Sequence, residues 1–195
     1  MTSLIPDRRG ALAALGVALA TGAVLLAMGR TAICQCGVVR LWWGTVQSAE
    51  NSQQLSDWYS ASHLIHGLLF YLFAHLLWRR WKLLGGRPAR WALPIAVVLE
   101  ACWELLENSP LIIDRYRAVT VSFGYEGDSV LNSLSDIGFM VLGFWLASKL
   151  PVWASVALAI FLELLTLYVI RDNLTLNVLM LVWPLEAVRQ WQAGG

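Results

Sequence analysis

One apolar stretch, Trp91 to Glu107, constrains the fold more than any other part of the chain. Its Leu, Ile, Val and Ala residues are typical of a helix that crosses a lipid bilayer. The stretch also contains Glu100, Glu104 and Glu107, which lie on one face of a helix at about 100° per residue. A carboxylate in hydrocarbon is energetically costly, so this face must contact protein, water or a ligand. The stretch therefore predicts a membrane helix with one polar face.

The composition also indicates a membrane protein. Of the 195 residues, 58% are hydrophobic and 14% are charged, and the mean hydropathy is +0.60. A soluble domain of this length cannot bury so much apolar surface, whereas a bilayer surrounds it with apolar solvent. We therefore expect a single membrane domain over residues 1–195, with the lipid bilayer as its partner. A net charge of +1 and the lack of a nucleic-acid-binding motif argue against nucleic acid as a partner.

The apolar runs predict an all-α fold, a polytopic transmembrane helix bundle of five or six spans. The predicted spans are 11–29, 60–78, 91–107, 129–148 and 152–170. The segment 174–188 is apolar but short and is broken by Pro184, so it is either a sixth span or a helix at the membrane interface. Two long loops, 30–58 and 108–127, lie on the same side of the membrane. Loops of this length usually have a function.

Basic residues predict the orientation. The connection between the second and third spans has five positive charges and no negative charge: Arg79, Arg80, Lys82, Arg87 and Arg90. Because positive loops stay in the cytoplasm, we expect this connection and the N-terminus, with Arg8 and Arg9, to be cytoplasmic. Both long loops then face the exterior. The expected localisation is the cell inner membrane, as a multi-pass protein.

Four predicted spans carry an ionisable residue at a similar depth below the long loops. These residues are His66, Glu100, Asp136 and Glu163. Each is about seven or eight residues from the outer end of its span, or roughly 10–12 Å at 1.5 Å per residue. Five more polar residues lie nearer to the mouth: His63, Glu104, Glu107, Asp128 and Asn132. We therefore expect one polar cavity that opens to the outer face.

The chemistry of these side chains gives each an expected role. The expected catalytic residues are His66, Glu100, Glu104 and Asp136. The expected substrate-binding residues are Arg115, Arg117, His63, Glu107, Asp128, Asn132 and Glu163. Buried histidines and carboxylates suit general acid–base catalysis, because burial shifts their pKa values, and they equally suit a proton or cation pathway.

Some of these residues also have a structural explanation. His63 could be solvated at the interface, and Asp128 could cap the fourth span. Glu100, Asp136 and Glu163 have no such explanation, because each lies deep in an apolar span without an adjacent opposite charge.

A divalent metal is the alternative to a hydrogen-bonded or proton-carrying network. Two histidines and several carboxylates could bind Zn²⁺ or an Fe/Mn pair. The sequence lacks the spacing of a recognised metalloenzyme such as HExxH, so we favour the network and leave the cofactor open. Cys34 and Cys36 could join a disulfide set or a metal clip, although their spacing would strain a mutual disulfide.

Several motifs in order resemble a known family. They are Cys34-x-Cys-Gly, Glu50-Asn-Ser-Gln-Gln, Asp57-Trp-Tyr-Ser60, Ser62-His63-x-x-His66-Gly67, Trp103-Glu-x-x-Glu-Asn-Ser-Pro110, Arg115-Tyr-Arg117 and Gly127-Asp-Ser-x-x-Asn-Ser-x-x-Asp136. Together, over about residues 30 to 150, they resemble an uncharacterised family of bacterial, mostly alphaproteobacterial, inner-membrane proteins. The resemblance implies a multi-pass membrane protein and carries no activity.

Three classes of function fit these observations. The first hypothesis is an enzyme that acts on a lipid or lipid-linked substrate from the outer leaflet, since the site lies below loops with Arg115 and Arg117. The second is a transporter or proton-coupled carrier, which needs a polar route to the cytoplasm where only His75 is available. The third is a non-catalytic assembly protein, in which arginines would pair with the carboxylates.

Overall fold

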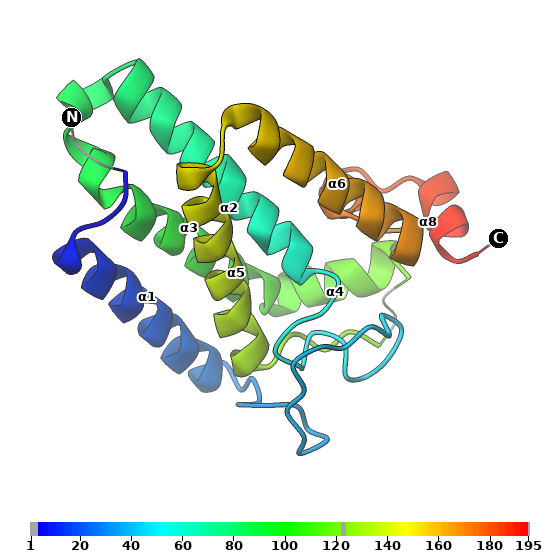
Figure 1. The fold of residues 1–195 in the computed structure, drawn as a ribbon. Coiled ribbons are helices and arrows are strands. Elements are labelled where there is room, and N and C mark those ends of the chain that lie inside the picture. The colour runs from blue at the N-terminus through cyan, green and yellow to red at the C-terminus, as the bar shows by residue number, and fades with distance from the viewer. Residues whose placement is uncertain (1–3, 122–123, 195) are drawn as a thin grey trace.

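The part of the chain that the structure describes consists of helices joined by loops and contains no strand. This computed structural model describes residues 4–121 and 124–194, so Ser122 and Phe123 of the second long loop lie outside it. Five long helices form the bundle (Figure 1): α1 (Arg8–Ala27), α2 (Ser60–Ala74), α3 (Ala92–Glu107), α5 (Val130–Lys149) and α6 (Val152–Ile170). The predicted all-α fold is confirmed.

Among the described residues, four helices are long and apolar enough to cross a membrane. They are α1, α2 together with the π-helical η1 (His75–Arg80), α5 and α6. Helix α3 has 16 residues. That corresponds to about 24 Å, somewhat less than the hydrocarbon thickness of a bilayer. The bundle therefore combines four full-length helices with a shorter one that carries the three glutamates.

The two ends of the bundle differ. At one end, which we call the loop end, the segments 28–59 and 108–129 gather (Figure 1). At the other, which we call the basic end, η2 (Leu83–Trp91) connects α2 with α3. Gly85 and Gly86 have positive φ there, a conformation that glycine adopts without steric cost. These glycines help the chain to reverse direction between the two helices.

Helices α2 and α5 run in the same direction, from the loop end to the basic end, and they cross at Gly67 and Gly143. A Cβ atom on Gly67 would lie 2.0 Å from the carbonyl oxygen of Met140, and one on Gly143 would lie 2.0 Å from that of Leu64. No larger residue fits at either position, so the two backbones come into direct contact. This close approach brings side chains of α2 and α5 within reach of one another on the loop-end side.

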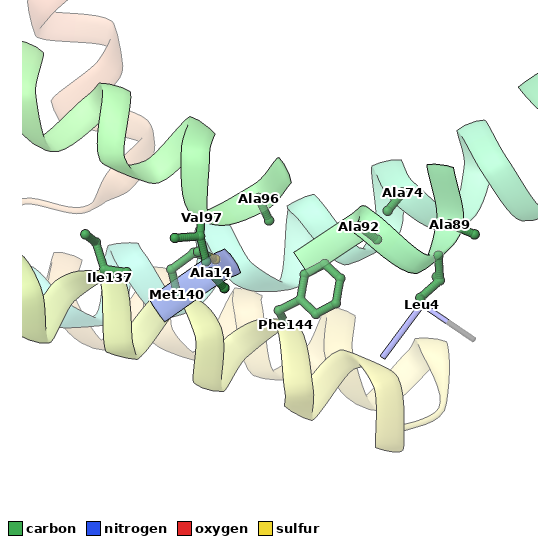
Figure 2. Close-up of a cluster of buried hydrophobic side chains, with 10 residues drawn as sticks. All are labelled: Leu4, Ala14, Ala74, Ala89, Ala92, Ala96, Val97, Ile137, Met140 and Phe144. Atoms are coloured by element: carbon green, nitrogen blue, oxygen red, sulfur yellow. The ribbon is translucent and has the colours of Figure 1, made fainter. Parts of the chain in front are cut away.

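A core of small and apolar residues joins α1, α2, α3, η2 and α5 (Figure 2). Its buried members are Leu4, Ala14, Ala74, Ala89, Ala92, Ala96, Val97, Ile137, Met140 and Phe144. Half of them are alanines, which allow helix axes to approach closely. None of them is ionisable, so this core contrasts with the polar cluster described below.

The segment 108–127 was predicted to be a loop. It contains helix α4 (Pro110–Val119). Proline suits the first turn of a helix, where its missing N–H would have no partner. Ile113, Tyr116 and Val119 bury one face of the helix. Polar residues between these positions conceal their helical spacing in the sequence.

The segment 174–188 forms a helical hairpin. It contains α7 (Leu174–Val182), a turn and the start of α8 (Glu186–Gln192). Nine residues of α7 span about 14 Å, less than half of the hydrocarbon thickness. The chain then returns to the end of α6 (Figure 1), where Nε2 of Gln192 donates a hydrogen bond to Oδ1 of Asp172 at 3.1 Å.

Asp172 makes the stability of this hairpin depend on pH. Burial raises the pKa of Asp172 to about 6, and its carboxyl also accepts a hydrogen bond from the Tyr59 hydroxyl at 3.2 Å. Because the folded-state pKa lies above the ordinary value of 3.8, this stabilisation is complete below about pH 4 and is lost as the pH rises through 6. We expect α8 amides, corrected for intrinsic rates, to exchange hydrogen several-fold faster at pH 7.5 than at pH 4.5. Asp172→Asn should remove most of that difference, and an unchanged pH dependence in the variant would contradict this assignment.

Candidate functional site

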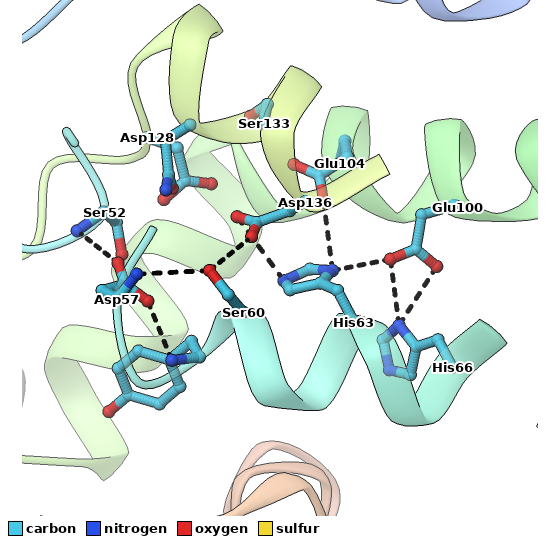
Figure 3. Close-up of polar contacts among 12 residues, drawn as sticks. Ser52, Asp57, Ser60, His63, His66, Glu100, Glu104, Asp128, Ser133 and Asp136 are labelled. Carbon is cyan, nitrogen blue, oxygen red and sulfur yellow. Dashed lines mark hydrogen bonds and ion pairs between the residues drawn. The ribbon is translucent and has the colours of Figure 1, made fainter. Parts of the chain in front are cut away.

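His63 on α2 lies at the centre of a buried cluster of ionisable side chains (Figure 3). Its Nδ1 atom is 2.6 Å from Oε1 of Glu100 and 3.5 Å from Oε1 of Glu104, both on α3. Its Nε2 atom is 3.8 Å from Oδ2 of Asp136 on α5. His63 therefore joins three helices through carboxylates on both sides of its ring.

His66 extends this cluster by one turn of α2 toward the basic end. Its Nδ1 atom is 3.1 Å from each carboxylate oxygen of Glu100. The rings of His63 and His66 meet edge to face, with centroids 5.3 Å apart. Glu100 is completely buried, and its carboxylate contacts both histidines. This carboxylate can fix the orientation of both rings.

Asp136 extends the cluster toward the loop end. Its Oδ1 atom accepts a hydrogen bond from Oγ of Ser60 at 3.0 Å, and that Oγ accepts one from the backbone N–H of Asp57 at 3.2 Å. Burial raises the pKa of the Asp57 carboxyl. A continuous polar chain thus runs from Asp57 through Ser60, Asp136, His63 and Glu100 to His66 (Figure 3).

Glu104 differs from the other carboxylates in its bonding. Its side chain is completely buried, and neither of its oxygens accepts a hydrogen bond from the described part of the chain. The nearby Nδ1 of His63 is already bonded to Glu100. A buried carboxylate without a hydrogen-bond donor is costly, so beyond its 3.5 Å contact with His63 Glu104 needs a proton or a group from outside the chain.

Asp128 bonds to side chains at the loop end. Its Oδ2 atom accepts a hydrogen bond from Nδ2 of Asn108 at 2.8 Å, and its Oδ1 atom accepts one from the Tyr125 hydroxyl at 2.8 Å. Burial raises the pKa of Asp128 to about 6. The cap of α5 is Ser129, whose side chain accepts from the backbone N–H of Asn132. Asp128 therefore belongs to the polar cluster and is not the helix cap.

A small polar cavity borders the cluster at the loop end. Its volume is about 40 Å³, which is enough for a few water molecules. Its lining comes from α2, α3, α4, α5, α7 and both loops: Asn51, Ser52, Tyr59, His63, Glu107, Tyr116, Tyr125, Asp128, Asn132, Asp136 and Asn177. The cavity thus brings His63 and Asp136 to a water-sized space shared with Glu107 and Asp128.

The loop 30–58 covers this cavity and is bonded to the start of α5. The backbone N–H of Ser129 donates to the carbonyl oxygen of Ser52 at 3.0 Å. Nδ2 of Asn132 donates to the carbonyl oxygen of Gln54 at 2.9 Å. Asn132 therefore fixes the loop over the site instead of pointing freely into the cavity mouth.

Cys34 and Cys36 are joined to each other by a disulfide, the pairing that their short spacing seemed to disfavour. An ion pair of 2.8 Å between Arg40 and Glu50 lies close by, since Sγ of Cys36 is 3.6 Å from the same Glu50 oxygen. These contacts order the covering loop. Cys102 on α3 is free and exposed.

Arg115 and Arg117 do not reach the buried carboxylates. Nε of Arg115 donates to the carbonyl oxygen of Leu181 at 3.0 Å, and Nε of Arg117 donates to that of Tyr125 at 2.6 Å. Both arginines therefore connect α4 with neighbouring segments. Arg115 and Arg117 were predicted to bind substrate, and the structure places both at the rim of the bundle.

Glu163 lies apart from the cluster, although its depth in the predicted span grouped it with His66, Glu100 and Asp136. Its carboxylate accepts hydrogen bonds from the backbone N–H groups of Leu174 at 2.9 Å and Thr175 at 3.2 Å. A negative charge at a helix N-terminus is stabilised by the free N–H groups and the helix dipole. The Glu163 side chain on α6 therefore caps the N-terminus of α7 and stabilises the C-terminal hairpin.

Sequence reasoning missed three members of the cluster: Asp57, Ser60 and Asn108. All three lie within the motifs that carry the family resemblance, which is the signal that could have found them. Sequence reasoning also placed His63 at the mouth of the cavity, whereas the structure places it at the centre of the cluster. A residue's distance from a helix end gives its depth but not the direction of its side chain.

Comparison with known proteins places this chain in a family. A sequence profile described as "Protein of unknown function (DUF2585)" matches residues 25–194. A UPF0314 protein of Novosphingobium aromaticivorans is 65% identical over 192 residues, which cover 98% of this chain and 96% of the relative. UPF0314 proteins of Sphingopyxis alaskensis and Rhizobium meliloti are 57% and 56% identical over 190 and 191 residues, covering 97% and 96% of this chain and 97% and 94% of the relatives. No solved structure matches the chain. The chain therefore belongs to the DUF2585 family of proteins of unknown function.

Proposed function

We propose that this protein is an integral inner-membrane enzyme that acts on a lipid or lipid-linked substrate from the outer leaflet. The observation that carries the proposal is His63 held between Glu100 and Asp136 beside a polar cavity. A histidine whose one nitrogen is fixed by a carboxylate can accept a proton through its other nitrogen. Here Glu100 fixes Nδ1, and Nε2 faces Asp136. In this mechanism, His63 is the general base, and Glu100 and His66 position it.

The surface of the bundle supports a lipid substrate. Helix α6 buries only Thr166, and it exposes large side chains such as Trp153 at 75% and Tyr168 at 88%. An apolar surface of this extent fits contact with lipid tails. Tyr116 on α4 and Asn177 on α7 line the cavity on the side of the C-terminal hairpin, where we expect a substrate headgroup to enter.

The outer-leaflet assignment depends on orientation, and we propose that the loop end faces the exterior. The support is the excess of Arg and Lys at the basic end, which favours the cytoplasm. A reporter fused after Gly86 is therefore expected to behave as cytoplasmic, and one fused after Gly124 as external. Paired phosphatase and fluorescent-protein fusions measure this. Reversed results at both positions would exclude action from the outer leaflet.

A proton-coupled carrier is the second candidate, because the polar chain from Asp57 to His66 could move protons. A carrier needs such a route across the whole membrane. Beyond His66 the next neighbour on α2 is the Phe70 ring, 6.0 Å away between centroids, and His75 stacks on Tyr71 instead of joining the chain. The polar route thus covers only the loop-end half of the bundle, and an enzyme fits it better.

Lipid analysis of a deletion strain tests the enzyme. We expect the strain to accumulate an unprocessed lipid or lipid-linked species, which wild-type protein should remove and His63→Gln should not. Purified protein in liposomes with an internal pH dye provides the comparison with a carrier. An unchanged lipid profile in the deletion strain, together with proton flux in liposomes, would reject the enzyme hypothesis and support the carrier.

A further inference from the structure

Three carboxylates from α3 and the start of α5 converge on one point beside the cavity. One oxygen each of Glu104, Glu107 and Asp128 lies within 4.8 Å of the others. Ligand oxygens on opposite sides of a cation at about 2.4 Å are themselves about 4.8 Å apart. The three oxygens therefore lie within the spacing that ligands of a single ion can have.

The described part of the chain brings neither lysine nor arginine to this group. Within residues 4–121 and 124–194, neither Lys nor Arg forms an ion pair with any of the three carboxylates. Arg30, at the same end of the bundle, donates to the carbonyl oxygen of Glu126. The nearest histidine, His63, lies 3.5 Å from Oε1 of Glu104, but its closer partner is Glu100 at 2.6 Å. Three carboxylates in a site of low dielectric repel one another unless protons or a cation offset their charge.

The bonding of the individual side chains favours a cation over a closed hydrogen-bonded group. Asp128 already has donors in Asn108 and Tyr125, so its oxygens are fixed and directed. Among the residues that the structure describes, Glu104 has no hydrogen-bond donor on either oxygen although it is completely buried. The cavity of about 40 Å³ is lined by Glu107 and Asp128, and it gives room for the water ligands that hard cations keep.

We propose that one hard divalent cation, of the Mg²⁺, Mn²⁺ and Ca²⁺ class, binds between Glu104, Glu107 and Asp128. An all-oxygen ligand set favours these ions over softer ones. A second possible set, His63 with Glu104 and Asp136, would favour a transition metal through its nitrogen ligand. We assign the ion to the carboxylate set because His63 already forms ion pairs with Glu104 and Asp136, whereas Glu107 and Asp128 form no ion pair within the described residues. The use of this ion, to hold the phosphate of a lipid headgroup beside His63, rests on the proposed function.

Titration with Mn²⁺ tests the binding itself. Full-length protein, purified in detergent and treated with chelator, is titrated while electron paramagnetic resonance measures free Mn²⁺. We expect one bound ion per wild-type chain, displaced by excess Mg²⁺ or Ca²⁺. Glu104→Gln and Asp128→Asn should each weaken binding by about tenfold or more, since even groups behind the ligands have effects of this size. Asp114→Asn, which changes an exposed carboxylate on α4, should bind as wild type.

Three results would overturn the site. They are a wild-type chain that binds no Mn²⁺, equal binding by Glu104→Gln, and weakening by Asp136→Asn without weakening by Asp128→Asn. If Glu104→Gln does not elute as a monodisperse protein, Glu107→Gln at the half-buried rim replaces it. Ion binding without a lipid phenotype would reject only the proposed function, and a lipid phenotype without ion binding would reject only the cation site.

Discussion

Replacing Gly143 by valine is expected to prevent the bundle from assembling. The Cβ atom of the valine alone would lie 2.0 Å from the carbonyl oxygen of Leu64. This oxygen belongs to the backbone of α2, so it cannot rotate away as a side chain could. Only separation of α2 from α5 can relieve that overlap, and overpacking typically costs about 1–3 kcal/mol and occasionally more. Gly67→Val should act in the same way, because its Cβ atom would lie 2.0 Å from the carbonyl oxygen of Met140.

The same helix offers a matched control for this substitution. Gly138 is exposed on α5, and a Cβ atom there has no neighbour within 4 Å. Gly138→Val should therefore leave the yield, the size-exclusion profile and the Tm of detergent-purified protein close to wild type. Gly143→Val should lower the Tm by more than 10 °C or yield only aggregate. Equal behaviour of the two variants would show that α2 and α5 do not meet at these glycines.

Replacing Glu100 by glutamine is expected to abolish activity and to leave assembly nearly intact. Glutamine keeps the shape of the side chain but carries no charge, so it cannot hold both histidines as the carboxylate does at 2.6 and 3.1 Å. General acid–base catalysis contributes about 10²–10⁴ in rate, and loss of an oriented base should cost a similar factor. We expect conversion of the accumulated lipid in membranes of the complemented strain to fall by about 100-fold or more.

His75→Gln is the control for this loss of activity. His75 lies on η1 and stacks on Tyr71, outside the polar chain. Its replacement should leave lipid conversion within about twofold of wild type, as expected for a surface change away from the site. If Glu100→Gln converts the lipid at the wild-type rate, His63 and its partners take no part in the mechanism, whatever the result for His75→Gln.

The long helices could be predicted because apolar runs of this length have few other structures. The predicted span 152–170 has the same bounds as α6, and 129–148 differs from α5 by one residue at each end. Helix α4 and the division of segment 174–188 into two short helices were not predicted, because short helices depend on tertiary contacts that the sequence pattern does not reveal. The hairpin depends on one such contact, between Glu163 and the first turn of α7.

The site could be predicted in composition but not in connectivity. A carboxylate in an apolar helix needs a polar neighbour, and this rule identifies Glu100 and Asp136. The same rule grouped Glu163 with them, since helices α2, α5 and α6 could be arranged in more than one way around α3. Which helix pairs meet depends on the contact between Gly67 and Gly143, and one glycine gives no sign of its partner on another helix.

The glycine contact has a mechanical consequence for the cluster. Ser60 precedes Gly67 by seven residues, and Asp136 precedes Gly143 by the same number, so the two side chains lie at equal arms of about 10 Å from one pivot. A scissor rotation of about 10° about this pivot would separate them by roughly 2 Å. That displacement would break the 3.0 Å hydrogen bond between Ser60 and Asp136 and would widen the cavity at the loop end. With rotation about this pivot, an open mouth and an unbroken polar chain would exclude each other.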